Sequence, residues 1–119
     1  MGILFVEYPK CSTCKKAGSW LNEQNVEFES RHIVEENPSA EELKTWHEIS
    51  GLGIKRFVNT SGMKYRELGL KEKIPEMSDQ EVYELLATDG MLAKRPILVG
   101  EDFALPGFKE AEWREKLGI

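Results

Sequence analysis

Near its start the chain contains the stretch Ile3-Leu4-Phe5-Val6-Glu7-Tyr8-Pro9-Lys10-Cys11-Ser12-Thr13-Cys14-Lys15-Lys16. Its first residues, up to Tyr8, are almost all apolar and β-prone, which is the pattern of a short strand buried on both faces. Pro9 ends that pattern, because proline lacks the N–H group that a strand interior needs. From Ser12 to Gln24 the chain consists of helix formers, and its apolar residues recur at helical spacing. The stretch therefore predicts a strand, a tight loop and a helix.

A second strand is predicted after this helix. Val26, Phe28 and Ile33 lie there among polar residues, a pattern compatible with a strand that crosses back beside the first. The three elements together make a βαβ unit, in which the two strands are parallel and the crossover is normally right-handed.

The middle of the chain is predicted to be helical. Ser39 is followed three residues later by Glu42, and Ser78 by Glu81, so two capping boxes precede apolar residues at helical spacing. Between these two helices, residues 54–73 have the composition of short helices joined by glycines.

The last third of the chain completes the fold. Two short strands are predicted over residues 97–99 and 103–105 around a tight turn, and a final helix over 108–117. The predicted order is βαβ, a helical insertion over about residues 38–92, and then ββα. This α/β order is the thioredoxin-like arrangement. No repeat or linker divides the sequence, so we expect a single domain over residues 1–119.

Composition and charge narrow the classes of function. The 119 residues include 16 basic and 21 acidic side chains, which gives a net charge of −5. A negative average field disfavours nucleic acid and anionic lipid as ligands. The apolar start, Met1–Val6, is too short for a signal peptide. Both cysteines lie in one motif, which is no secreted disulfide framework. We therefore expect a cytoplasmic protein that binds neither nucleic acid directly nor a membrane.

The C-x-x-C motif is the strongest chemical signal in the sequence. Cys11 is expected at a helix N-terminus, where unpaired N–H groups and the helix dipole stabilise the reactive thiolate. Cys14 follows one helical turn later on the same face, close enough to form a disulfide with Cys11. The same N–H groups, with the hydroxyls of Ser12 and Thr13, are positioned to bind a small oxyanion beside the nucleophile.

Other interpretations of these residues remain open on the sequence alone. The two cysteines are also compatible with half of a zinc site, for which His32 and His47 would be the remaining ligands, but this spacing matches no common finger or ribbon. They are also compatible with inert core residues. Arg95, before Pro96, would on composition alone be an ordinary surface arginine.

Four stretches carry a resemblance to a known family: Tyr8–Ala17, Asn59–Leu70, Lys94-Arg95-Pro96 and Gly107-Phe108. Through them the chain resembles the arsenate reductase/Spx family of ArsC-like proteins, and within it the YusI-type branch. The resemblance covers essentially the whole chain. It implies a thioredoxin-like fold with a helical insertion.

The resemblance also implies roles for single residues. Cys11 matches the nucleophile of the family, Arg95 its anion-contacting arginine, and Pro96 a cis-proline that faces the cysteine. Two further arginines of the glutaredoxin-dependent arsenate reductases have no counterpart, because one position falls on Asn59 and the other belongs to the strand at 103–105. These departures weaken the case for arsenate as the substrate.

Two functions follow from the residues and the resemblance. The first is a thiol-disulfide oxidoreductase related to arsenate reductase, with Cys11 as the nucleophile and Cys14 as the resolving thiol, acting on a small oxyanion or a disulfide. It needs no metal or organic cofactor, but it needs an external thiol reductant of the glutathione/glutaredoxin or thioredoxin type. The alternative is an Spx-like redox-sensing regulator that binds the α subunit of RNA polymerase. Cys14 favours this second function, because Spx-type redox switches carry both cysteines.

Overall fold

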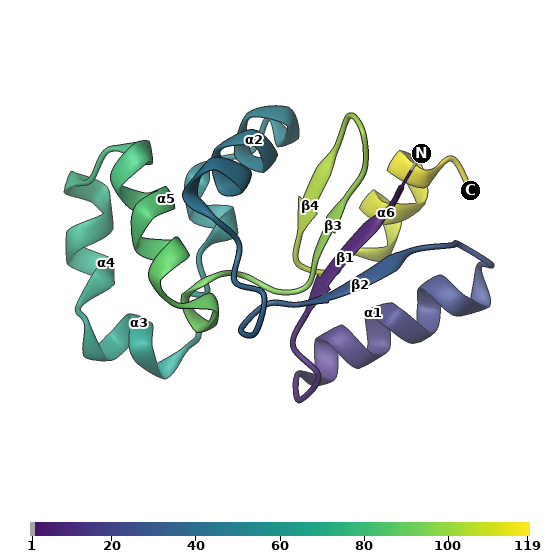
Figure 1. Cartoon of the computed structure of the whole chain (residues 1–119), viewed down its shortest axis with the longest axis horizontal. Coiled ribbons are helices and arrows are strands. Elements are labelled where there is room, and N and C mark those ends of the chain that lie inside the picture. The colour runs from purple at the N-terminus through teal and green to yellow at the C-terminus, as the bar shows by residue number, and fades with distance from the viewer. Residues whose placement is uncertain (1) are drawn as a thin grey trace.

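A computed structural model of the chain describes residues 2–119. Met1, which begins the apolar stretch considered for a signal peptide, lies outside these residues. The fold contains a four-stranded sheet in the order β2-β1-β3-β4. β1 pairs in parallel with β2 and antiparallel with β3, and β3 pairs antiparallel with β4. Figure 1 shows the sheet near one end of the molecule. The strands are β1 (Leu4–Glu7), β2 (Glu29–His32), β3 (Ile97–Val99) and β4 (Ala104–Pro106).

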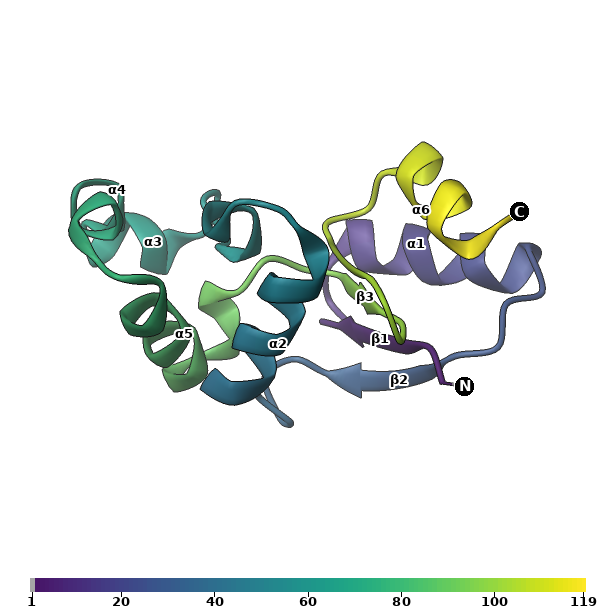
Figure 2. The ribbon, with the colours of Figure 1, turned by 90° about the horizontal axis from the view of Figure 1, so that it is seen from above.

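Two helices cover one face of this sheet. Figure 2 shows α1 (Ser12–Glu23) and α6 (Glu110–Leu117) on the same side of the strands. Successive side chains of a strand point to opposite faces, so Phe5 and Leu98 pack with Trp113 beneath these helices. The residues next to Phe5 and Leu98 along their own strands pack on the opposite face of the sheet. β1 is therefore buried on both sides, which explains its continuous apolar sequence.

The other face packs against the helical insertion between β2 and β3. Its two longest helices begin at the predicted capping boxes. The side chain of Ser39 accepts a hydrogen bond from the Glu42 N–H, and the side chain of Ser78 accepts one from the Glu81 N–H. Figure 1 shows the insertion at the end of the molecule opposite the two termini. It consists of α2 (Ala40–Ser50), η1 (Ile54–Phe57), α3 (Met63–Glu67), α4 (Leu70–Lys73), η2 (Ile74–Glu76), α5 (Asp79–Thr88) and η3 (Gly90–Leu92).

The α/β, thioredoxin-like fold class is confirmed. Three boundaries differ from those predicted. β2 covers only Glu29–His32, so Val26, Phe28 and Ile33, on which its prediction rested, lie outside the strand. β4 begins at Ala104 because the carbonyl of Phe103 accepts the N–H of Gly100 at 2.9 Å and closes the turn. α6 begins at Glu110, two residues later than predicted, because Gly107 adopts φ +78° and Phe108 turns inward onto the Trp113 ring, 4.8 Å away between centroids. Within residues 2–119, no helix combines the length and the apolar composition needed to cross a bilayer.

Candidate functional site: two thiols beside a basic pocket

Cys11 lies at the junction between β1 and α1. It is the N-cap residue of α1, with an extended backbone, and its carbonyl accepts the N–H of Lys15 at 3.1 Å as the helix begins. Its own N–H donates to the carbonyl of Tyr8 at 3.0 Å, which closes the tight loop predicted around Pro9. The Cys11 side chain is partly exposed, so its sulfur is accessible to a substrate.

Cys14 lies one turn further along α1 and is fully buried. Its Sγ accepts a hydrogen bond from the Tyr8 N–H at 3.5 Å. Both thiols are free in this structure, with no disulfide between them. The motif therefore combines one accessible sulfur with one sulfur enclosed by the helix and the loop.

The surroundings shift the pKa values of the two thiols in opposite directions. Partial burial alone would raise the pKa of Cys11. This effect is outweighed by hydrogen bonds from the backbone and thiol of Cys14 and from the backbone of Thr13, together with the positive charge of Arg95. The pKa of Cys11 is therefore lowered. Burial raises the pKa of Cys14 to about 12, and the hydrogen bond with Cys11 acts in the same direction. The pair therefore ionises first at the accessible sulfur, while Cys14 keeps its proton.

Arg95 lies in the loop that leads into β3. Its guanidinium carbon is 5.1 Å from the centroid of the Tyr8 ring, a cation–π arrangement that places the charge beside the cysteine loop. Nη1 makes a long hydrogen bond of 3.5 Å to the Met91 carbonyl, and the buried Nε has no hydrogen-bond partner. The peptide bond between Arg95 and Pro96 is cis. Arg95 is thus half-buried, with its charge beside the cysteine loop and its Nε–H enclosed without a partner.

The two hydroxyl residues of the motif differ in their surroundings. Thr13 lines a pocket next to the start of α1, and its backbone is one of the groups that lower the pKa of Cys11. Ser12 is exposed and does not line that pocket. The structure therefore brings Cys11, Cys14, Thr13 and Arg95 together and leaves the Ser12 side chain at the surface.

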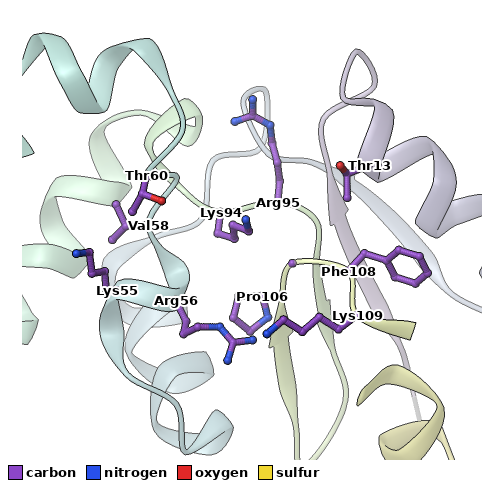
Figure 3. Close-up of a pocket in the computed structure, with 11 residues that line it drawn as sticks. Thr13, Lys55, Arg56, Val58, Thr60, Lys94, Arg95, Pro106, Phe108 and Lys109 are labelled. Carbon is purple, nitrogen blue, oxygen red and sulfur yellow. The ribbon is translucent and has the colours of Figure 1, made fainter. Parts of the chain in front are cut away.

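The pocket that Thr13 lines has a volume of about 500 Å³ and lies between the sheet and the insertion. Figure 3 shows its walls, to which η1, the loop before β3 and the loop before α6 all contribute. Sequence reasoning missed most of its basic residues; the adjacent pair Lys55-Arg56 and Lys109, directly after Gly107-Phe108, were the available signals. The residues that line it are Thr13, Lys55, Arg56, Val58, Thr60, Lys94, Arg95, Pro106, Gly107, Phe108 and Lys109.

The two histidines have local structural contacts. Nδ1 of His32 accepts the N–H groups of Val34 and Glu35, both at 3.1 Å. Nδ1 of His47 shares a hydrogen bond of 2.7 Å with the hydroxyl of Tyr83. In the part of the chain that the structure describes, neither ring joins a group of three or more potential metal ligands. His32 therefore caps a turn, and His47 joins α2 to α5.

Comparison with known proteins finds relatives that match this chain over most of its length. The chain is 54% identical to the uncharacterized protein YusI of Bacillus subtilis over 97% of this chain and 98% of YusI. It is 36% identical to the regulatory protein MgsR of the same organism, over 92% and 86% of the two chains. It is 28% identical to the global transcriptional regulator Spx 2 of Bacillus anthracis, over 90% and 80%.

Solved structures show the same architecture. An ArsC family related protein from Bacteroides fragilis superimposes with a TM-score of 0.94 at 53% identity, over 97% of each chain. The arsenate reductase from Vibrio cholerae does so with a TM-score of 0.82 at 26% identity, over 100% of this chain and 98% of the other. The model of the ArsC family matches residues 6–116, a span that includes both thiols and Arg95. This chain belongs to the ArsC family.

Proposed function

We propose that this chain is a cytoplasmic thiol-disulfide oxidoreductase related to arsenate reductase, with Cys11 as its nucleophile and Cys14 as its resolving thiol. The observation that carries the proposal is the placement of the two thiols, Cys11 partly exposed at the N-terminus of α1 and Cys14 fully buried one turn later, which lowers the pKa of Cys11 and raises that of Cys14. A lowered pKa makes the attacking thiolate available. A resolving thiol that stays protonated does not compete for the substrate.

The reaction with a disulfide RS–SR has two steps. The Cys11 thiolate attacks one sulfur, a Cys11–SR bond forms, and the RS⁻ that leaves takes a proton from water. Cys14 then loses its proton, attacks Sγ of Cys11 and releases the second RS⁻. The protein dithiol has lost two electrons and the substrate has gained them. With arsenate, Cys11 would attack arsenic and displace hydroxide, and the attack of Cys14 would release arsenite.

Two groups of this chain support the first step. The positive charge of the Arg95 guanidinium and the N–H groups of the first turn of α1, at Ser12 and Thr13, are suited to stabilise the negative charge of an oxyanion or a leaving thiolate. An external thiol reductant, of the glutaredoxin or thioredoxin type, then returns the dithiol state. Oxidised Cys11 is the accessible sulfur of the disulfide, so the reductant would attack there.

The test compares the native protein with Cys11→Ser and Cys14→Ser in thiol-dependent reduction of arsenate and of hydroxyethyl disulfide. We expect Cys11→Ser to be inactive. Without added thiol reductant, Cys14→Ser should react once with hydroxyethyl disulfide and retain one half of it as a mixed disulfide, which is measured as added mass. Equal rates in all three proteins would exclude a role for either thiol.

The similarity to MgsR and to Spx 2 favours a second candidate, a redox-sensing regulator that binds the α subunit of RNA polymerase. The resemblance to Spx implies that Gly53 would lie near the polymerase contact of such a regulator. A Cβ at Gly53 would meet no atom within 4 Å, and the residue has φ −67°, so Gly53→Arg should fold. We expect capture on the α subunit to depend on the redox state and to be lost in Gly53→Arg. No capture in either redox state removes this candidate.

A further inference from the structure

The pocket beside the thiols is strongly basic in a chain that is acidic as a whole. Five of the eleven residues that line it are basic and none is acidic, whereas the chain carries a net charge of −5. A cleft lined by one sign of charge concentrates ligands of the opposite sign. The basic residues are Lys55, Arg56, Lys94, Arg95 and Lys109.

These cations have almost no counter-charge. Nη2 of Arg56 lies 3.6 Å from Oε1 of Glu112, and within residues 2–119 this is the one ion pair that any of them forms. Figure 3 shows the charged ends of Arg56 and Lys109 directed toward one another beside Pro106, while Lys55 extends away from them. Like charges on the walls of one pocket repel each other, so an anion between them would be bound favourably.

The pocket is large enough to hold a small molecule. Its volume of about 500 Å³ falls in the range of small-molecule pockets rather than of a single tetrahedral ion. Gly107, which adopts φ +78°, lines the pocket, and a Cβ there would approach Cε of Lys94 to 3.0 Å. Cys11 does not itself line the pocket, but Thr13, two residues further along the chain, does, so a bound ligand would lie beside the start of α1.

We propose that this pocket binds the phosphate groups of a low-molecular-weight disulfide, which is then the substrate of Cys11. The proposal rests on the oxidoreductase function above and names its substrate class. Oxidised glutathione carries an ammonium group on each of its two γ-glutamyl units, and the lining residues include no carboxylate to receive it. Phosphate carries a charge of about −1.5 to −2 without any cation of its own, which suits this set of side chains.

The chemical step is the two-electron exchange already described, with R a phosphate-bearing group. One disulfide and the protein dithiol give the Cys11–Cys14 disulfide and two thiols RSH. A dithiol reductant such as dithiothreitol, added only after the oxidation has been measured, restores the protein and is itself oxidised.

The test measures the rate at which three disulfides oxidise the reduced, full-length protein: coenzyme A disulfide, oxidised glutathione and uncharged hydroxyethyl disulfide. We expect coenzyme A disulfide to react about 10-fold faster than the uncharged disulfide at low salt, with the advantage declining as salt screens the pocket. Lys94→Gln/Lys109→Gln should reduce this rate ratio by about 10-fold. Lys44→Gln/Lys71→Gln, with the same charge change at two exposed residues outside the pocket, should leave the ratio as it is.

The possible results distinguish failure of the phosphate site from failure of the proposed oxidoreductase function. Equal rates for coenzyme A disulfide and hydroxyethyl disulfide, or an equal loss of the ratio in the two double variants, would overturn the phosphate site and leave the oxidoreductase intact. A faster reaction of oxidised glutathione than of coenzyme A disulfide would also overturn it. If no disulfide oxidises Cys11, the proposed function fails as well.

Discussion

At the scale of single residues, the chemistry depends on the difference between two identical thiols. Cys11 is favoured as a thiolate because N–H groups of α1 and the charge of Arg95 outweigh its partial burial. In Arg95→Gln the guanidinium charge is gone, so the pKa of Cys11 should rise. The alkylation rate of Cys11 at neutral pH should then fall several-fold, with its midpoint moved to higher pH. The measurement is iodoacetamide labelling against pH, with the labelled cysteine identified by mass.

Lys10→Gln is the matched control for this prediction. It removes a positive charge next to Cys11 in sequence, but Lys10 is not among the groups that shift the pKa of Cys11. The same midpoint in the native protein and in Arg95→Gln would contradict the role of Arg95. Labelling of Cys14 in the folded protein would contradict its burial.

At the scale of elements, the two capping boxes determine where α2 and α5 begin. In the second box the Ser78 Oγ accepts the Glu81 N–H at 3.1 Å, and the Glu81 carboxylate accepts the Ser78 N–H at 2.9 Å. Ser78→Ala should lower the free energy of unfolding by about 1 kcal/mol, because it leaves a helix N–H without its partner. The measurement is urea unfolding. Ser61→Ala changes an exposed serine outside any helix, so a similar loss there would show that the box is not the cause.

Local sequence patterns predicted most of the helices and strands but few of the residues that line the pocket. The apolar run of β1, the capping boxes and the position of Cys11 at a helix start are each specified within a few residues. The pocket instead combines Arg56 of η1 with Lys109 before α6, residues that meet only after the insertion has folded against the sheet. Pro106 is tolerated in β4 because that strand lies at the edge of the sheet. The edge position could not be predicted from the sequence, because local composition does not specify the order of the strands.

At the scale of the whole molecule, one ion pair joins the sheet to the helical insertion. Arg31 at the end of the parallel pair donates to both oxygens of Glu42 in α2, at 2.6 and 2.8 Å. Glu42 also receives the Ser39 N–H at 3.0 Å, so one carboxylate serves both the cap of α2 and the contact with β2. The hydrogen bonds from Arg31, against the opposing effect of burial, lower the pKa of Glu42 from 4.5 to about 2.

This shift predicts how acid weakens the molecule. Because the folded pKa lies below the unfolded one, the pair contributes its full stability above about pH 4.5 and loses it as the pH falls toward 2. Glu42→Gln keeps the side-chain shape and the capping acceptor but removes the charge, so it should cost about 1 kcal/mol at pH 7, a modest value because the carboxylate is partly exposed and screened. The difference between the two proteins, from urea unfolding at several pH values, should disappear near pH 2. Glu41→Gln, on the adjacent residue of α2, controls for a general change of charge. A difference that stays constant with pH would show that packing, and not the ionised carboxylate, holds the insertion to the sheet.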